Sequence, residues 1–332
     1  MTINEIAKMA GVSRTTVSRY LNNGYVSKEK AERIREVIDQ TGYRPSRQAQ
    51  MLRTKQTHLI AVILPKINSD SISREVSGIS TALARTGYEL ILANTNNHES
   101  EELKYLRLFA ADQSVDGIIL IGTILTQEHI RLISSLNLPI VVLGQKTDAC
   151  ACVFYDDYNA SKKLTEHLCR TGKEIGFIGV TDRDKAAGEA RRHGFQDALK
   201  EAGFHISKQN MIRCDFAIDS GYEACRKLLK ANPSIDSLFC ATDNIAIGAM
   251  LYLREIGRSI PDDIQLVGTG DSDKAHVVVP TLTTAHYYYR TSGKETARIL
   301  LSLLSGLEKV PREVKMGYKI VYGGSTRQIP DE

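Results

Sequence analysis

The residues whose types and spacing suggest specific chemistry lie near the N-terminus, in the stretch GVSRTTVSRYLNNG (residues 11–24). On a helix, the polar positions i, i+1, i+4, i+5 and i+8 of this stretch share one face, which carries Arg14, Thr15, Ser18, Arg19 and Asn22. Guanidinium, hydroxyl and amide groups are complementary to the edges of base pairs in a DNA major groove. A solvated helix is the simpler alternative, but serine and threonine are weak helix formers for which such a helix has no need. We therefore expect this face to contact DNA bases.

Three short helices are expected around this stretch. Residues 2–10 begin with a threonine followed three positions later by a glutamate, which is the pattern of a capping box. Ser13 is a candidate N-cap for the second helix, and a third helix is expected to begin near Ser27 and to end before Gly42. Two helices joined by a short glycine turn, with a third beside them, have the geometry of a helix-turn-helix.

A second basic motif, YRPSRQAQMLRTKQT, occupies residues 43–57. A short helix over about residues 45–53 would combine an apolar tip with flanking cations. That composition suits a helix that enters a DNA minor groove and wedges apart a base step. An ordinary linker is the alternative.

Charge is unevenly distributed along the 332 residues. Residues 1–56 hold 11 Lys and Arg against 5 Asp and Glu, a net charge of +6, whereas the remainder holds 32 against 34, a net charge of −2. A basic head on a mildly acidic body is expected when the head binds a polyanion, although a solvated basic face has the same composition. The six cysteines show neither a metal-binding spacing nor a disulfide framework, so we expect free thiols in a reducing cytoplasm.

The body, from about residue 58, alternates apolar runs with helical periods. The runs form two series typical of buried parallel strands, at residues 59–65, 88–95, 115–122 and 139–144, and then at 175–180, 237–242 and 264–270. The pattern predicts an α/β fold, with an N-terminal all-α helix-turn-helix head followed by two doubly wound parallel-sheet lobes.

The head, TINEIAKMAGVSRTTVSRYLNN followed by GYRPSRQAQMLR, resembles the head of the lactose-repressor/galactose-repressor family of bacterial transcription factors. The body motifs VDGIIL, ATDNIAIGAM, VGTGD and PTLTT stand where that family's motifs stand, so the resemblance spans nearly the whole chain. It implies that Arg14, Thr15 and Arg19 read bases and that Thr16 and Ser18 position the helix on phosphates. It also implies that Leu52 is the wedge of a hinge helix, with Ala49 and Arg53 beside it.

The resemblance also implies the domain organisation. Residues 1–57 would be the DNA-binding domain with its hinge helix, and residues 58–332 an effector-binding and dimerisation domain of periplasmic-binding-protein type. Its N-lobe would comprise about residues 58–157 and 287–319 and its C-lobe about 158–286 and 320–332, so that the chain crosses between lobes near residues 157, 286 and 320. Hinge helices in this family pair on DNA, and no leucine heptad tail follows GGST near the C-terminus. A homodimer on a palindromic operator is therefore expected.

An effector site is expected in the cleft between the lobes, because ligands of such sheets bind at the carboxyl ends of the strands. Arg191, in RRHGF, matches an Arg-x-x-Gly-aromatic motif whose arginine holds a ligand hydroxyl or carboxylate in the family. Phe216 falls where the family often places an aromatic ring against the sugar. The candidate ligand-binding residues are Lys66, Tyr155, Arg191, Phe216, Asp243 and Asp271. A surface salt bridge for Arg191, and core positions for Tyr155 and Phe216, are the alternatives.

The nature of the effector follows from finer features. Thr269 and Gly270 replace a Tyr-Asp pair that many family members carry, so a common hydroxyl contact has to be supplied otherwise or is absent. Lys66, Arg191 and Arg192 would place cations in the cleft, which suits a sugar phosphate. The motifs PKINSDS, GQK, VFYDDYNAS and ATDNIA most resemble those of sucrose-operon repressors, with trehalose repressors as neighbours. The hypothesis is a repressor released by sucrose or sucrose 6-phosphate; a trehalose 6-phosphate repressor is the alternative.

Other function classes fit less well. The sequence has no Gly-rich phosphate loop, no Gly-x-Ser-x-Gly and no His-x-x-x-His pair, so we expect no enzyme activity, no cofactor and no metal. No apolar run is long enough to span a membrane, and the N-terminus does not resemble a signal peptide, which disfavours a secreted sugar-binding protein. A global catabolite regulator, with a phosphorylated carrier protein as coregulator, stays open as a further alternative.

Overall fold

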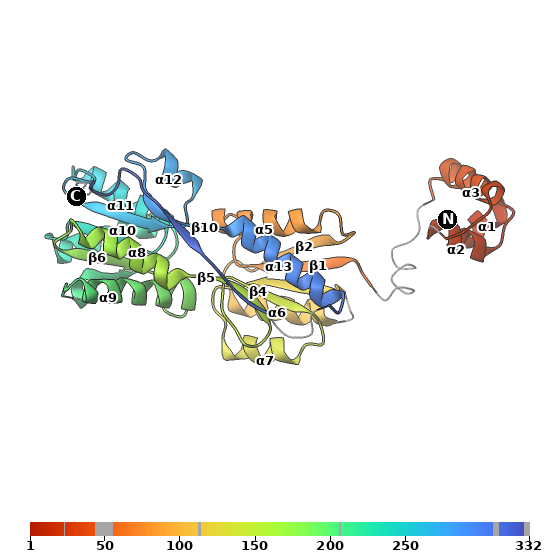
Figure 1. Ribbon diagram of the computed structural model, residues 1–332, viewed down its shortest axis with the longest axis horizontal. Helices are drawn as coiled ribbons and strands as arrows, with labels where there is room; N and C mark the ends of the chain where they lie inside the picture. The colour runs from red at the N-terminus through yellow and green to blue at the C-terminus, as the bar shows by residue number, and fades with distance from the viewer. Residues whose placement is uncertain (23, 44–55, 112–113, 206, 308–311, 329–332) are drawn as a thin grey trace. The chain divides into compact units, whose positions relative to one another are not determined.

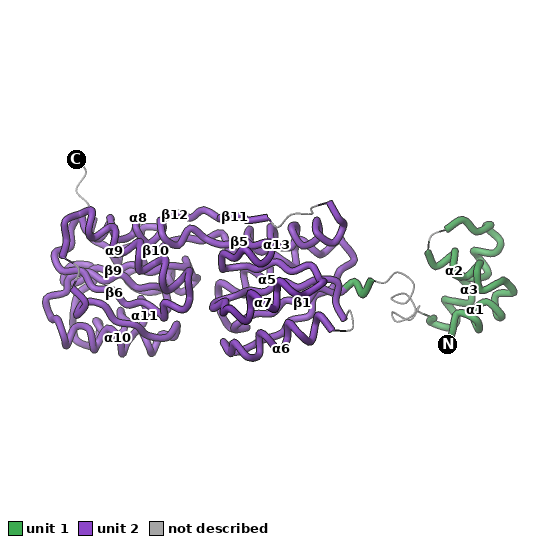
Figure 2. The backbone as a smooth tube through the Cα atoms, turned by 90° about the horizontal axis from the view of Figure 1, so that it is seen from below, with its two compact units in different colours: residues 1–58 green, residues 59–332 purple. Residues whose placement is uncertain are grey.

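The computed structural model of the chain describes residues 1–22, 24–43, 56–111, 114–205, 207–307 and 312–328 (Figure 1). The hinge helix expected over residues 45–53, with Ala49, Leu52 and Arg53, lies outside the described residues. The chain divides into two compact units, residues 1–58 and residues 59–332 (Figure 2).

The first unit is the predicted set of three helices, α1 (Ile3–Met9), α2 (Arg14–Leu21) and α3 (Lys28–Thr41). Thr2 and Glu5 form the capping box of α1, and the Ser13 side chain caps α2 by accepting from the Thr16 backbone N–H. Gly42 ends α3 in the left-handed conformation, at φ 61°. A small apolar core joins the helices and consists of Ile6, Ala7, Ala10, Val17, Ile34 and Val37. Capping and core together fix α2 with its polar face outward.

The second unit contains two six-stranded sheets, one in each lobe. The N-lobe sheet has the order β11-β5-β4-β3-β1-β2, and every pair of neighbours is parallel. Its strands are β1 (Leu59–Leu64), β2 (Glu89–Asn94), β3 (Gly117–Ile121), β4 (Ile140–Leu143), β5 (Ala151–Tyr155) and β11 (Glu313–Met316). Its helices are α5 (Asp70–Leu83), α6 (Glu99–Ala110), α7 (Gln127–Ser135) and α13 (Tyr289–Leu304).

The C-lobe sheet has the order β12-β10-β9-β8-β6-β7 and is parallel except for the antiparallel pair β10 and β12. Its strands are β6 (Ile175–Gly179), β7 (Met211–Arg213), β8 (Ser237–Cys240), β9 (Gln265–Thr269), β10 (Thr283–Tyr287) and β12 (Tyr318–Val321). Its helices are α8 (Asp157–Cys169), α9 (Arg191–Glu201), α10 (Ile218–Ala231), α11 (Asp243–Glu255) and α12 (Asp273–Val277). A π-helical turn, Lys185–Ala190, precedes α9, and a 3-10 turn, Lys208–Asn210, precedes β7. A helical head followed in the chain by two doubly wound lobes is the fold class that the sequence predicts.

Three crossovers connect the lobes. The chain leaves the N-lobe after β5, returns after β10, and crosses again between β11 and β12 (Figure 1). The last crossover lies at Gly317, slightly before the position expected near residue 320, because Tyr318 already pairs with Tyr287 in the C-lobe sheet. The residues that follow β5 and β10 therefore lie where the two lobes meet.

The closest helix packing in the N-lobe is between α5 and α13, and it depends on two glycines. A Cβ on Gly78 would lie 2.1 Å from the carbonyl oxygen of Arg290, and a Cβ on Gly293 would lie 2.1 Å from that of Glu75. Real Cβ atoms do not approach backbone oxygens so closely, so both positions require glycine in this packing. The close approach brings the first turns of α13 against the middle of α5, from Glu75 to Gly78, at one wall of the cleft described below.

Candidate functional site

The polar face of α2 is accessible in the first unit. Arg14, Thr15, Arg19 and Asn22 are exposed, and Ser18 is half-buried, whereas Val17 on the opposite side of the helix is fully buried. Within the described part of the chain, no carboxylate pairs with Arg14 or Arg19. An exposed helix face of this composition can enter a major groove.

Two residues of this segment have local partners that limit their freedom. The Thr16 hydroxyl lies 2.9 Å from the Ser13 hydroxyl, inside the N-cap of α2. The Asn22 side-chain amide donates a hydrogen bond to the backbone carbonyl of Ser18, at the C-terminal end of the same helix. Both side chains therefore stabilise the helix ends, and Asn22 has to exchange this bond to contact a base.

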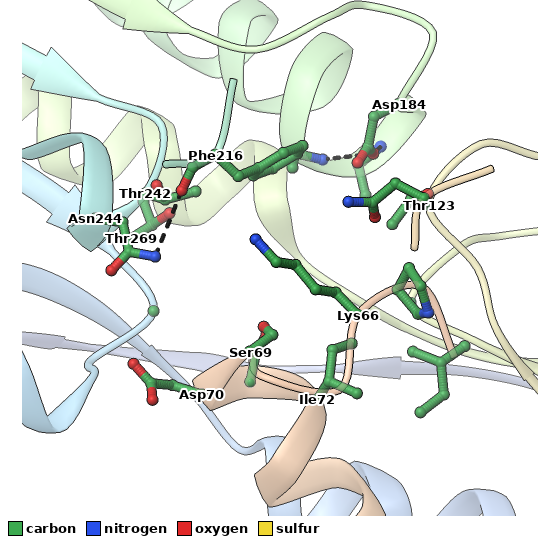
Figure 3. A pocket seen from close by; sticks show the side chains of 18 of the residues that line it. Lys66, Ser69, Asp70, Ile72, Thr123, Asp184, Phe216, Thr242, Asn244 and Thr269 are labelled. Carbon is green, nitrogen blue, oxygen red and sulfur yellow. Dashed lines mark hydrogen bonds between the residues drawn. The ribbon is translucent and has the colours of Figure 1, made fainter. Parts of the chain in front are cut away.

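The second unit has a cleft of about 560 Å³ where the lobes meet (Figure 3). The N-lobe contributes residues that follow β1, β3 and β4 and the first turns of α5, together with Tyr155 and Tyr289. The C-lobe contributes Asp157, residues after β6 to β9, and Arg191. Strand ends from two parallel sheets thus face one cavity, which is the usual location of a ligand site in this architecture.

Arg191 lies in the cleft wall as a fully engaged, buried cation. Its Nε and Nη2 atoms each lie 2.7 Å from Oδ1 of Asp157, and Nη1 donates to the carbonyl of Ala241 and to the Thr269 hydroxyl, both at 2.5 Å. Burial alone would lower the pKa of Arg191, but the combined effect of Asp157, Tyr287 and Tyr289 raises that pKa. Most of the guanidinium N–H groups therefore already have protein partners, so Arg191 chiefly organises the wall.

Thr269, at the end of β9, contacts Arg191 in the cleft wall. Its hydroxyl contacts Arg191 and also donates to the carbonyl of Ala241 at 2.6 Å. The side chain at this strand end is thus used to hold the arginine.

Tyr155 is buried where β5 meets α5 and α13. Its hydroxyl lies 2.5 Å from Oε1 of Glu75 and 2.7 Å from Oγ of Ser292, and its ring packs edge-on against Tyr289. Burial raises the pKa of Tyr155 well above its usual value. Tyr155 lines the cleft, but its hydroxyl is already bonded within the N-lobe.

The two carboxylates at the C-lobe strand ends differ in position. Asp243 lines the cleft, but it is buried and accepts hydrogen bonds from the Ser272 backbone at 2.7 Å and the Thr284 hydroxyl at 2.5 Å. Burial raises the pKa of Asp243. Asp271 is not among the residues that line the cleft, because its backbone, at φ 50°, turns its carboxylate to His276 and His286. The structure therefore does not bring Asp271 to the expected site.

Lys66 and Phe216 are the sequence-selected residues that are exposed in the cleft. The Lys66 side chain extends into the cavity from the N-lobe, and Phe216, which is 39% exposed, comes from the C-lobe loop before α10 (Figure 3). The carbonyl of Phe216 accepts a bond from Nδ2 of Asn244 at 3.4 Å, while Oδ1 of Asn244 is buried with no partner among the described residues. A cation, an aromatic ring and an unpaired amide oxygen are thus available to a ligand.

Several cleft residues are not among those selected from the sequence. Gln145 donates from Nε2 to Oδ1 of Asp184 at 2.8 Å, so these two side chains join the lobes across the cleft. Arg74 also joins the lobes, through bonds to the carbonyls of Gly270 at 2.8 Å and Asp271 at 3.0 Å. Gln145 directly follows a predicted strand, which is a usable signal, whereas Arg74 lies inside a helical period that gives none.

The charges that line the cleft do not favour an anion as strongly as the sequence suggested. Arg192 pairs with Asp182 at 3.1 Å and is not a lining residue. The lining cations among the described residues are Lys66, Arg74 and Arg191, and the lining carboxyl groups are Asp70, Glu75, Glu99, Asp157, Asp184, Asp215 and Asp243. Of those cations, Lys66 is the one that makes no hydrogen bond or ion pair with the described residues, so it is the position best suited to an anionic group.

Comparison with known proteins matches two parts of the chain to family models. A family model described as "Bacterial regulatory proteins, lacI family" matches residues 2–46, and one described as "Periplasmic binding proteins and sugar binding domain of LacI family" matches residues 57–321. The chain belongs to the LacI family.

LacI-family relatives match over most of their length. The chain is 32% identical over 292 residues to the sucrose operon repressor of Staphylococcus xylosus, which covers 88% of this chain and 90% of that protein. It is 30% identical over 315 residues to the regulator CelR of Thermobifida fusca, covering 92% of each. Its structure is similar to that of a CelR–cellobiose complex, with a TM-score of 0.76, 27% identity, and coverage of 98% of this chain and 99% of that chain.

The fold is also similar to that of the lac repressor dimer bound to operator and the anti-inducer ONPF. The TM-score is 0.90 at 23% identity, over 98% of this chain and 99% of that chain. These LacI-family relatives are transcription regulators, and the chain is a DNA-binding regulator of this family rather than an enzyme. None of the described helices is both long and apolar enough to cross a membrane.

Proposed function

We propose that this LacI-family regulator represses a sugar-utilisation operon in the cytoplasm, binds a palindromic operator as a homodimer, and is released by sucrose or sucrose 6-phosphate. The observation that carries the proposal is the pairing of an exposed, base-complementary helix face with a two-lobed cleft whose free groups suit a sugar. Arg14, Thr15, Arg19 and Asn22 contact bases in this proposal, and Thr16 and Ser18 position α2 on the backbone.

The mechanism is a linkage between two ligands. The operator favours the lobe arrangement that pairs the two hinge segments of the dimer, and the effector favours a different arrangement by bonding to both lobes. Because each ligand stabilises its own arrangement, each weakens the binding of the other by the same factor. Residues that bond across the cleft, such as Gln145 and Asp184, belong to this equilibrium.

Sucrose is the favoured form of the effector. Phe216 offers an apolar surface to a sugar ring, and the unpaired oxygen of Asn244 can accept from a hydroxyl group. The lining carboxylates would repel a phosphate group, whereas sugar hydroxyls donate to them. The sucrose operon repressor of Staphylococcus xylosus is among the relatives of the chain, which supports the same sugar.

Sucrose 6-phosphate is the second candidate, and one observation favours it. Lys66 is exposed in the cleft and extends into the cavity, where it could pair with a phosphate (Figure 3). In this proposal Lys66, Tyr155, Arg191, Phe216 and Asp243 form the binding site.

The test is thermal stabilisation of the full chain by sucrose, sucrose 6-phosphate, trehalose 6-phosphate, fructose and glucose 6-phosphate. A rise in melting temperature with sucrose or its 6-phosphate supports the proposal. A response confined to trehalose 6-phosphate would replace sucrose by trehalose as the regulated sugar. If no sugar raises the melting temperature and a phosphorylated carrier peptide raises the operator affinity, the chain is a catabolite regulator instead.

A further inference from the structure

Glu75 is a buried carboxyl group in the cleft wall that the proposed function does not yet use. It lies on α5 one turn after Ile72, which also lines the cleft, and its residue is only 2% exposed. Its Oε1 atom lies 2.5 Å from the Tyr155 hydroxyl. Its Oε2 atom is buried and has no hydrogen-bond partner among the described residues.

A count of hydrogens identifies the protonation state of this group. Three short contacts run in series: Glu75 Oε1 to the Tyr155 hydroxyl at 2.5 Å, that hydroxyl to Ser292 Oγ at 2.7 Å, and Ser292 Oγ to the carbonyl of Tyr289 at 2.8 Å. Each contact needs one hydrogen, and the two hydroxyl groups supply two. With an ionised Glu75, Tyr155 donates to Oε1 and one of the other two contacts lacks a hydrogen. With a protonated Glu75, all three contacts are hydrogen bonds, because the carboxyl donates from Oε1 to Tyr155 while Tyr155 donates to Ser292.

The surroundings of Glu75 agree with a neutral acid. Burial raises its pKa to about 8, against the opposing effects of Tyr155 and Arg74. Tyr155 on β5 and Tyr289 on α13 are the titratable groups that face it from the elements packed against α5, and burial raises the pKa of both. Arg74, its neighbour on α5, directs its guanidinium to the carbonyls of Gly270 and Asp271 instead.

With the proton on Oε1, the Oε2 atom is a carbonyl-type oxygen that can only accept a hydrogen bond. We propose that Glu75 is a specificity-determining residue of the cleft, whose free oxygen Oε2 accepts a hydrogen bond from a hydroxyl group of the effector. A hydroxyl group supplies the missing donor. A phosphate oxygen at this position is itself an acceptor and could not form a hydrogen bond with Oε2. The inference rests on the proposed sugar-responsive function and assigns the α5 wall to a neutral part of the sugar.

Three variants of the full chain test this assignment, with sucrose and sucrose 6-phosphate as probes in calorimetric titrations. Glu75→Gln preserves the pattern, because its amide donates to Tyr155 and its oxygen accepts from the ligand; its affinity should stay within about threefold of wild type. Glu75→Leu has similar volume but no acceptor, and its affinity should fall about tenfold or more. Glu102→Gln is the control for a buried carboxyl group away from the cleft, because Glu102 is also 2% exposed but does not line the cleft, and its Oε2 lies 3.4 Å from Nε2 of His129. Its affinity should not change.

The outcomes separate this inference from the function on which it rests. Loss of affinity in Glu75→Leu with retention in Glu75→Gln supports the assignment, provided that both variants melt cooperatively. Equal affinity in Glu75→Leu and wild type overturns the assignment of Glu75 alone. Loss in Glu75→Gln as large as in Glu75→Leu overturns the neutral-acid assignment. A wild-type chain that binds neither sugar overturns the proposed effector, and this inference with it.

Discussion

At the scale of single residues, burial decides what a side chain can do in the cleft. Arg191 was selected from a motif for its chemistry with sugars, yet the structure surrounds it with Asp157, Ala241 and Thr269. A buried cation needs such partners, because its desolvation is costly without them. Lys66 has no such partners among the described residues, and its side chain stays available in the cavity (Figure 3). The exposed lysine, rather than the buried arginine, is therefore the group that can discriminate a charged ligand.

The Arg191–Asp157 pair gives a stability prediction. Asp157→Ala leaves the guanidinium buried without its carboxylate, so the free energy of unfolding should fall by about 3–5 kcal/mol. Denaturant titration of the full chain measures this loss. The control is Asp182→Ala, which breaks partly exposed pairs with Arg192 and Arg213 and should cost about 1 kcal/mol or less. Equal losses in the two variants would contradict the structural role of the buried pair.

Arg14 gives a prediction on DNA recognition. Arg14→Ala removes a guanidinium from the exposed face of α2, so binding to the operator should weaken by about 1–3 kcal/mol and preference at one base position should relax. Competition between operator variants and random DNA measures both effects, while the response to sugar should be unchanged. An equal loss on operator and random DNA would show that Arg14 contacts only phosphates.

Glu75 gives a prediction on pH. The pKa of Glu75 in the folded chain, about 8, lies above the usual value of 4.5. The contribution of this group to the free energy of unfolding is therefore highest below pH 4.5, where the group is protonated in both states, and it falls as the pH rises to about 8. Glu75→Gln cannot titrate, so it should become more stable than wild type over this range. One pKa unit corresponds to about 1.4 kcal/mol, so the difference should reach a few kcal/mol at pH 8. Unfolding of both proteins at a series of pH values measures the difference. A difference that stays constant with pH would contradict a buried, protonated Glu75.

The sequence could identify part of this site for physical reasons. Lys66, Arg191 and Phe216 follow strands or lie in motifs, and all three line the cleft. Glu75 and Arg74 lie inside a helical period, where nothing in the spacing shows which face meets a cavity. Asp271 follows shortly after a predicted strand, but its left-handed backbone turns the carboxylate to His276 and His286, and a run of strand residues does not predict that turn.

At the scale of helices and strands, long apolar runs were predictable and short polar strands were not. The buried strands β1, β3 and β4 follow from continuous apolar runs. β7, β11 and β12 have three or four residues each, and no residue in them is buried. Their pairing is decided by their neighbours in the sheet, which local sequence does not record.

The packing of α5 on α13 gives a prediction at this scale. Gly293→Ala places a methyl group against the backbone of Glu75, so the helices have to separate and the free energy of unfolding should fall by about 1–3 kcal/mol or more. Gly317→Ala is the control, because nothing lies within 4 Å of its Cβ position and its backbone is not left-handed. The melting temperatures of the two variants, compared with that of the wild-type chain, measure the two losses. A loss in Gly317→Ala as large as in Gly293→Ala would contradict the packing argument.

At the scale of the whole molecule, the proposed mechanism is an equilibrium between two lobe arrangements of the dimer, one favoured by the operator and the other by the effector. The side-chain bonds between the lobes in the described part of the chain are polar, and they include those of Arg74, Gln145, Arg183 and Lys274. A ligand that bonds to both lobes can therefore shift their arrangement. The domain division of the chain is a prediction from charge and periodicity, since the basic head and the alternating body differ in both. The sign of the coupling depends on the energies of two arrangements and is not encoded in any motif.

The most direct test of the central claim is operator affinity measured with and without sucrose or sucrose 6-phosphate. The full chain first selects its operator from a pool of random DNA, and binding is then titrated against each sugar. The account predicts a palindromic operator whose affinity falls as the sugar rises, with sugar affinity lowered by the same factor when operator is present. A selected site without symmetry, or operator affinity that does not change or that increases with both sugars, would contradict it.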